Sequence, residues 1–199
     1  MNGAINLKSI ESFLSKKYIH LNQIWIQQKL EVFNKINSNP STFENSIYNE
    51  FLKSNINESV DKQKVINLKE KINKEKPHEL IQGYFLFQIE EYVNIAEPQY
   101  KINKNFNNLD VVEDSEIETK YLQNEDDKSK KVFEKKIFKI KLNQGLSDNR
   151  EVYIYGFEYK PIKNIENYLD IKNQKVIVGP SFESRRGFIY LTNENIKFL

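Results

Sequence analysis

The stretch GYFLFQIEEYVNIAEPQY, residues 83–100, constrains the fold more than any other part of the chain. Phe85, Phe87 and Ile89 occupy every second position, with Leu86 and Gln88 between them on the other face. A period of two residues is typical of a β-strand with one buried face. The alternation slips near Glu91, which predicts a bulge and a bend within one long strand.

Strand-like runs return only after a long, mostly polar segment. The runs KKIFKIKLNQG and REVYIYGFEYKP alternate in the same way, and Gly145 between them predicts that they pair as a hairpin. QKVIVGP and RRGFIYL predict two further short strands, the second of which NIKFL extends. Five strands, the first of them long and bent, favour a small Greek-key barrel of the OB type. A five-stranded antiparallel sheet covered by helices is the alternative that the pattern leaves open.

The first third of the chain predicts helices, because its apolar residues recur at spacings of three and four. These stripes are formed by Leu7, Ile10 and Leu14, by Ile26, Leu30 and Phe33, and by Ile47 and Phe51. Asn22 is a predicted N-cap for the second helix. Ser41 and Glu44 have the spacing of a capping box before the third helix.

These patterns predict an α+β protein, in which a three-helix module precedes a five-stranded OB-fold β-barrel with a long insertion between strands 1 and 2. The predicted limits are 1–56 for the helical module, 57–82 for a connector, 83–199 for the OB-fold domain and about 99–134 for the insertion.

Composition and motifs argue against an enzyme. The chain has 30 basic and 28 acidic residues, a formal charge of +2 and no cysteine, which excludes disulfides and thiolate zinc sites. His20 and His78 have no second ligand at metal-binding spacing, and the common nucleotide, hydrolase and zinc-protease motifs do not occur. No apolar stretch approaches the ~20 residues that span a bilayer. We therefore predict no catalytic residues, no cofactor, no metal, no small-molecule substrate and no membrane partner.

A nucleic-acid site is one of two interpretations of the strand residues. The candidate DNA contacts are Lys136, Lys139, Lys141, Arg185 and Arg186, with Tyr153, Tyr155 and Tyr159 nearby. A basic groove with aromatic side chains suits single strands, whose bases stack on the rings. The balanced charge favours the other interpretation, in which the lysines form a solvated strand face and the tyrosines lie in the core.

At LIQGYFLFQIEEYVNIAEPQYKI the chain resembles the start of the OB domain of the RMI1 family (RecQ-mediated genome instability protein 1). The positions that carry the resemblance are Gly83, Tyr84, Gln88, Ile89, Pro98 and Tyr100. YGFEYKPI is similar to the family's third strand, and KVIVGPSFESRRGFIYLTNENIKFL is similar to its closing hairpin. Trp25 and IYNEFLKSN fall where the family has a helical module, so that the resemblance covers nearly the whole chain in order.

The resemblance implies a nuclear, non-catalytic subunit of a RecQ helicase–topoisomerase III complex that dissolves double Holliday junctions in homologous recombination and DNA repair. Its implied partners are a type IA topoisomerase III, a RecQ-family helicase and, weakly, DNA. In that family the loop between the first two barrel strands inserts into the topoisomerase gate, which would make 99–134 the contacting segment. The candidate contacts are Pro98, Tyr100, Phe106, Leu109, Asp110, Val111, Val112, Glu113, Ile117, Tyr121 and Leu122.

Two other functions remain as alternatives. One is a stand-alone OB-fold protein that binds single-stranded nucleic acid, which predicts salt-sensitive binding in isolation. The other is a relative that partners a different topoisomerase III isoform and RNA-related proteins.

Overall fold

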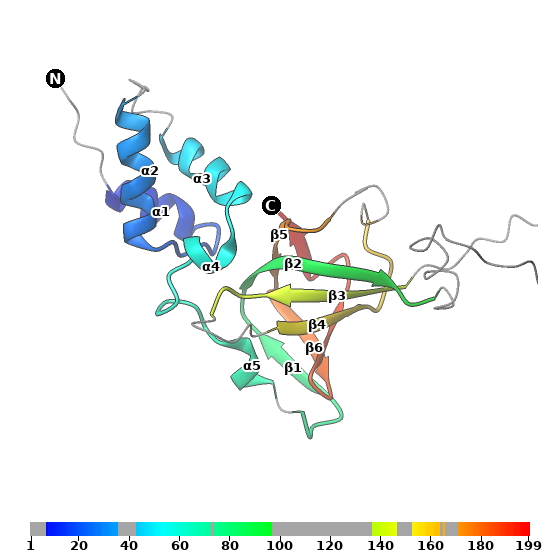
Figure 1. Ribbon diagram of the computed structural model, residues 1–199. Coiled ribbons are helices and arrows are strands. Elements are labelled where there is room, and N and C mark those ends of the chain that lie inside the picture. Colours follow the sequence, from blue (N-terminus) through cyan, green and yellow to red (C-terminus); the bar gives the residue numbers. More distant parts are fainter. Residues whose placement is uncertain are drawn as a thin grey trace, which may run out of the picture. The chain divides into compact units, whose positions relative to one another are not determined.

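The structure is a computed structural model that describes residues 7–35, 43–72, 74–96, 137–146, 153–163, 165 and 171–199 (Figure 1). The chain divides into two compact units, of which the first joins Met1–Val93 to Phe138–Leu199. The second unit is Asn94–Ile137. All described helices and nearly all described strand residues belong to the first unit.

Five helices occur in the described part of the chain: α1 Leu7–Ser15, α2 Gln23–Lys35, α3 Phe43–Lys53, α4 Ile56–Ser59 and α5 Leu68–Lys71. The three longer ones coincide with the predicted helices, and their apolar stripes are buried except at Leu7 and Phe33, which are partly buried. Asn22 caps α2 as predicted, because its Oδ1 accepts a hydrogen bond from the Ile24 amide at 2.8 Å. Ser41, and with it the predicted capping box, lies outside the described residues.

The region interpreted as a connector, 57–82, contains more structure than its sequence indicated: most of α4, α5 and the first strand. Its charged, weakly periodic sequence hid these elements because each is only four residues long. Asparagine caps start both short helices, with Asn55 accepting from the Asn57 amide at 2.9 Å and Asn67 from the Lys69 amide at 3.1 Å.

The strands are β1 Glu79–Gln82, β2 Phe85–Asn94, β3 Phe138–Asn143, β4 Tyr153–Glu158, β5 Lys175–Val178, β6 Ser181–Arg185, β7 Phe188–Leu191 and β8 Ile196–Phe198. They form one sheet in the order β1-β6-β7-β4-β3-β2-β5-β8. The predicted hairpin is confirmed, because β3 and β4 are antiparallel. β4 and β7 are parallel, and the other recorded strand pairs are antiparallel.

Eight strands are described where five were predicted. Two of the additional strands arise because long strands are interrupted, between β1 and β2 and between β5 and β6. The third is β8, which pairs with β5 instead of extending β7 as predicted. Only Gly83 and Tyr84 separate β1 from β2 in the sequence, yet β1 lies at one end of the strand order and β2 lies near the other. The sheet must therefore curl so that its two ends meet. Gly83 has φ 126° there, and its amide donates to the Pro180 carbonyl at 2.7 Å. The slip predicted near Glu91 does not interrupt β2, which runs on to Asn94.

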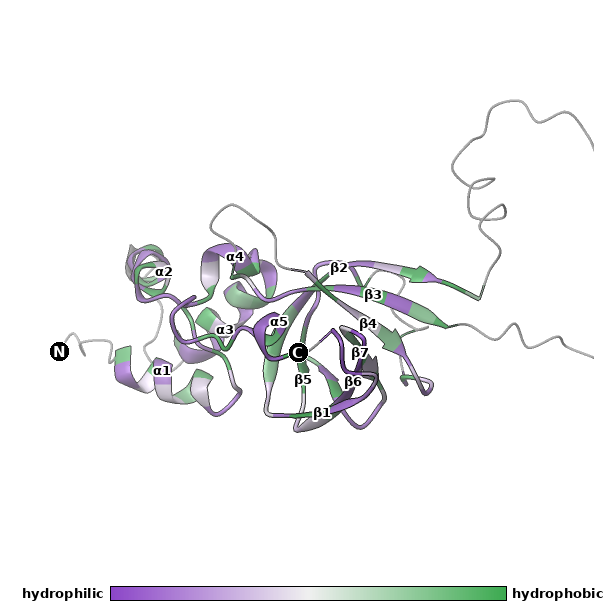
Figure 2. Ribbon diagram, turned by 90° about the horizontal axis from the view of Figure 1, so that it is seen from below, coloured by the Kyte–Doolittle hydropathy of each residue, from purple (hydrophilic) through white to green (hydrophobic). Residues whose placement is uncertain are grey.

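The two faces of β2 are buried against different neighbours. Phe85, Phe87 and Ile89 belong to the core inside the curled sheet, whereas Leu86 packs with the helices. Ile177 of β5 joins the same helical cluster. The helices therefore cover β2 and β5 from outside, while hydrophilic and hydrophobic residues alternate along β3 (Figure 2).

The second unit begins and ends at one pair of neighbouring residues. The Ile95 amide donates to the Ile137 carbonyl at 2.8 Å, and the Ile137 amide donates to Oδ1 of Asn94 at 3.1 Å. The described ends of the segment between β2 and β3 are therefore joined directly to each other.

Candidate binding face on the sheet

Basic and aromatic side chains share the outer side of β3, β4 and β7, which we call the outer face. It consists of Lys139, Lys141, Tyr153, Tyr155, Phe157 and Phe188. It follows from the alternation of β3, because Ile140 and Leu142 are buried in the core and their neighbours point the other way. The same alternation on β4 buries Ile154 and leaves Tyr155 exposed.

Each lysine of the outer face lies over a tyrosine ring of the neighbouring strand. Lys141 Nζ is 3.8 Å from the ring centroid of Tyr153, and Lys139 Nζ is 4.6 Å from that of Tyr155. Lys141 is directly opposite Tyr155 in the strand register, so each lysine reaches its ring diagonally. Such a cation–π contact contributes about 0.5–1 kcal/mol at an exposed site.

The aromatic rings continue from β4 onto β7. The centroid of Phe188 lies 4.9 Å from that of Phe157 and 6.4 Å from that of Tyr155. Farther along, Tyr159 and Tyr190 are 5.3 Å apart, and the Arg185 guanidinium lies 5.0 Å from the Tyr190 centroid. Cations and rings therefore follow one another across four strands of the sheet.

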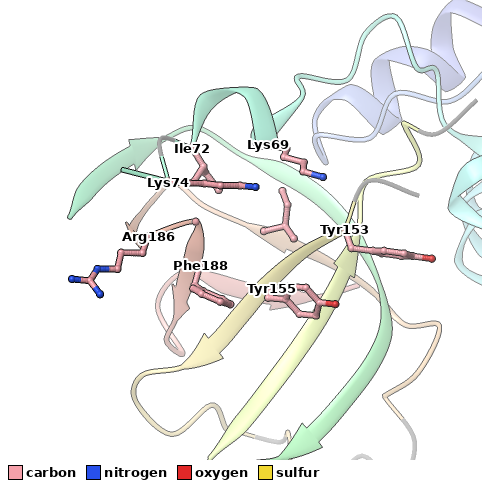
Figure 3. Close-up of a pocket in the computed structure, with 9 residues that line it drawn as sticks. Lys69, Ile72, Lys74, Tyr153, Tyr155, Arg186 and Phe188 are labelled. Carbon is pink, nitrogen blue, oxygen red and sulfur yellow. The ribbon is translucent and has the colours of Figure 1, made fainter. Parts of the chain in front are cut away.

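A pocket of about 320 Å³ opens beside the outer face. Its lining consists of Lys69, Ile72, Lys74, Tyr153, Ile154, Tyr155, Arg186, Gly187 and Phe188. Figure 3 shows Lys69 and Lys74 on the side of α5, Tyr155 and Phe188 on the sheet, and Arg186 extending outward at the rim. Among the described residues that line it, none is acidic.

The turn between β6 and β7 shapes one wall of this pocket. Arg186 and Gly187 have φ of 50° and 88°, a conformation that glycine adopts without strain. A Cβ on Gly187 would lie 3.2 Å from Cγ of Lys74. The glycine thus lets the aliphatic stem of Lys74 pack against the turn.

The sequence-predicted DNA contacts are separated by the structure. Lys139 and Lys141 lie on the outer face, Arg186 lines the pocket, and the Arg185 guanidinium lies over the rings of Tyr159 and Tyr190. Lys136 lies outside the described residues, as do all the predicted partner contacts from Pro98 to Leu122. These assignments therefore stay predictions.

The interpretation that placed the tyrosines in the core is wrong for two of them. Tyr155 is 37 % exposed and Tyr159 is 54 % exposed. Sequence reasoning also missed Lys69, Lys74 and Phe188 as neighbours of this face. The alternation of RRGFIYL could have placed Phe188 opposite the buried Ile189, but no local signal connects the two lysines to the sheet.

Two further kinds of feature are not found among the described residues. No group of three or more His, Asp or Glu side chains there could hold a metal ion. None of the described helices has the length and apolar character that crossing a membrane requires. The one lysine with a large pKa shift is Lys175, whose pKa burial lowers to about 8, and it hydrogen-bonds α3 rather than facing the pocket.

A curled sheet whose first long strand is interrupted between β1 and β2, and in which β4 runs parallel to β7, is the sheet of an OB-fold domain. The family described as RMI1, N-terminal OB-fold domain, matches residues 56–199. The chain therefore belongs to this family, as its resemblance indicated. A comparison with curated proteins gives no match.

Proposed function

We propose that the chain is a non-catalytic subunit of a nuclear complex between a RecQ-family helicase and a type IA topoisomerase III. In this role it binds topoisomerase III and helps the complex to dissolve double Holliday junctions. The observation that carries the proposal is membership of the RMI1 family across residues 56–199.

The segment between β2 and β3 is the proposed contact with the topoisomerase. Its described ends are joined to each other, because the Ile95 amide donates to the Ile137 carbonyl. The composition suits an arm that stays solvated when unbound, because most of its residues are polar. Val111, Val112 and Leu122 offer apolar anchors, and the acidic residues between 110 and 118 complement a basic enzyme surface.

An inserted segment regulates a gate only through differential contacts. A type IA topoisomerase must open and close to pass a strand, and a ligand shifts that balance by the ratio of its affinities for the two states. A tenfold preference for one state corresponds to about 1.4 kcal/mol, which a few buried side chains can supply. The proposed subunit thus changes the rate of strand passage without a catalytic group.

Deleting residues 104–131 tests the proposal, with a sequence-scrambled segment of equal length and composition as the matched control. We expect both variants to keep the thermal unfolding midpoint of the intact chain. We also expect both to lose binding to topoisomerase III in size-exclusion chromatography and its stimulation of decatenation. Undiminished binding and decatenation with the deletion variant would remove this segment from the mechanism.

A further inference from the structure

A second pocket lies where the turn after α1 meets the start of β2, and we call it the tyrosine pocket. Its lining includes Tyr18, His20, Lys64, Ile66, Tyr84 and Leu86. Its volume of about 280 Å³ accommodates one large side chain, since a cavity of about 150 Å³ holds a benzene ring. We propose that the tyrosine pocket receives an apolar side chain from an acidic peptide segment of a partner protein. These side chains lie outside the segment between β2 and β3, so the inference does not rest on the proposed function.

Exposed apolar side chains gather at the tyrosine pocket. Tyr18, Ile66 and Tyr84 are 45 %, 53 % and 40 % exposed, and all three line it. Leu86, which also lines the pocket, is buried among the apolar residues of the helices. Single exposed apolar residues are ordinary on a protein surface, whereas a group of them around a pocket indicates an interaction site.

The backbone at Tyr18 has a conformation that disfavours a side chain. Its φ is 60°, in the left-handed region where a helix usually ends with glycine. Hydrogen bonds fix this turn, because the Tyr18 amide donates to the Ser15 carbonyl at 2.9 Å and the Ile19 amide donates to the Leu14 carbonyl at 3.0 Å. Tyrosine is strained here and glycine would not be, so the strain points to a role for the tyrosine ring.

The ring of Tyr18 lies flat against the ring of Tyr84. Their centroids are 3.8 Å apart and their planes differ by 16°. This stack leaves no space for a nucleobase between the two rings. An aliphatic or aromatic side chain can instead contact the exposed parts of both rings together with Ile66. The geometry therefore favours a peptide over a nucleic acid.

The charged side chains at the tyrosine pocket are basic. Lys64 lines it, and no acidic residue is recorded in the described part of its lining. Lys16 and Lys17 directly precede Tyr18, and neither has a recorded ion pair to an Asp or Glu side chain within the described ranges. Asp61 pairs with Lys64 at 3.5 Å, but exposed ion pairs of this kind are weak. Carboxylates beside the apolar side chain of a peptide would complement this surface.

Selection of a random peptide library displayed on phage, with the full chain as bait, tests the proposal. We expect the enriched peptides to share a leucine or an aromatic residue flanked by Asp or Glu. Fluorescence anisotropy then measures the affinity of a labelled synthetic copy of one enriched peptide. Failure to enrich any peptide, or enrichment of basic peptides, would overturn the proposal.

Ile66→Glu should weaken binding of this peptide roughly tenfold, because it places a carboxylate among the exposed apolar side chains. The matched control is Ile24→Glu, which adds the same charge at an isoleucine that is 65 % exposed on α2. We expect near-normal binding from the control and unchanged thermal unfolding from both variants. An equal loss of binding in the two variants would contradict the proposal.

Replacing lysines tests the charge of the partner. Lys16→Gln with Lys64→Gln should weaken peptide binding roughly fivefold and make it less sensitive to salt. Lys160→Gln with Lys163→Gln removes the same charge at two exposed lysines after β4 and should leave binding unchanged. Displacement of the peptide by an oligothymidylate of equal charge would show a general polyanion site and overturn the proposal.

Tyr18→Gly separates a binding role of the stacked rings from a structural one. Glycine adopts the φ of 60° without strain, so we expect the thermal unfolding midpoint to stay the same or rise. Peptide binding should weaken roughly fivefold, because one of the exposed rings is lost. Unchanged binding with a lower midpoint would show that the rings only join α1 to the sheet, and the proposal would be wrong.

Discussion

Two lysines of this protein lie over aromatic rings in very different surroundings. Lys175 Nζ is 5.0 Å from the ring centroid of Phe51, and Lys141 Nζ is 3.8 Å from that of Tyr153. Lys175 is only 2 % exposed, and it donates to the carbonyls of Leu52 and Ser54 at 3.0 and 2.6 Å. No hydrogen-bond acceptor is recorded for Lys141 within the described residues.

The difference shows that a cation over a ring does not by itself indicate a role. Lys175 extends from β5 to the C-terminal end of α3, where carbonyls have no partner within the helix, and so it joins the helices to the sheet. Lys141 Nζ lies over the ring of Tyr153, and no hydrogen bond from it to a buried group is found within the described residues. The hydrogen-bond acceptors that an ammonium group contacts, rather than a nearby ring, distinguish a structural lysine from one that binds a ligand.

Lys175→Ala should give the largest effect of the substitutions that test this comparison. It removes the donor to two carbonyls, each costing about 1–3 kcal/mol when left unpartnered, and it removes buried methylenes worth about 0.8 kcal/mol each. Relief of the buried charge offsets part of this loss. We expect the free energy of unfolding to fall by about 3 kcal/mol in urea denaturation. A loss no larger than that of Lys141→Ala would contradict the structural role.

Gln144→Met should have the next largest effect. The Gln144 side chain is 1 % exposed, accepts from the Leu68 amide at 2.9 Å and donates to the Ile66 carbonyl at 3.1 Å. Methionine keeps the volume but leaves both backbone groups unpartnered, so we expect a loss of about 2 kcal/mol. Urea denaturation measures it, and the exposed Gln63→Met is the matched control. Equal stability of the two variants would show that α5 is not held through Gln144.

The pH dependence of stability also distinguishes Lys175 from Lys141. Burial lowers the pKa of Lys175 to about 8, against the weaker opposing effect of Glu90, whereas the unfolded chain has the ordinary pKa of 10.5. Below pH 8 both states hold the proton, so this group adds no pH dependence. Between pH 8 and 10.5 the unfolded chain binds more protons, and stability from this group rises with pH.

Comparing the chain with Lys175→Met isolates this contribution. The difference in unfolding free energy should change in favour of the unsubstituted chain from pH 8 to 10.5 and stay constant from pH 6 to 7.5. Chemical denaturation at each pH measures it. A difference that is flat across the whole range would show that Lys175 titrates normally.

Lys139→Gln with Lys141→Gln should give the smallest change in stability. Each side chain is only partly buried and contributes a surface cation–π contact, so we expect a loss below about 1 kcal/mol for the pair. Thermal unfolding measures it. A much larger loss would mean that these lysines support the sheet, and the outer face would then resemble the Lys175 site.

Part of the fold was predictable because its signals are local. Phe85, Phe87 and Ile89 alternate, and their burial in the core follows from that spacing. The break at Gly83 was not predicted, because it depends on a hydrogen bond to Pro180 far along the chain. The alternation could be predicted because its residues are close in sequence, whereas the break could not because its hydrogen-bond partner is distant.

Only part of the candidate site could be predicted from the sequence. Lys139 and Lys141 were identified from their strand, whereas Lys69 and Lys74 come from a region whose sequence has no clear period. The place of α5 depends on Gln144, a residue 76 positions from Leu68 that carries no local sign of this role. Lys175 was missed for the same reason, since its acceptors lie 121 and 123 positions away.

The hydrogen bond between Ile95 and Ile137 has a consequence for how this chain can vary over evolution. With the two ends of the segment joined, lengthening the sequence between them raises the entropic cost of loop closure only slowly. This cost grows by about 0.6 kcal/mol for each doubling of the loop length. Insertions and deletions there should be nearly neutral for the rest of the domain. We therefore expect the length of this segment to vary more among relatives than the lengths of the strands.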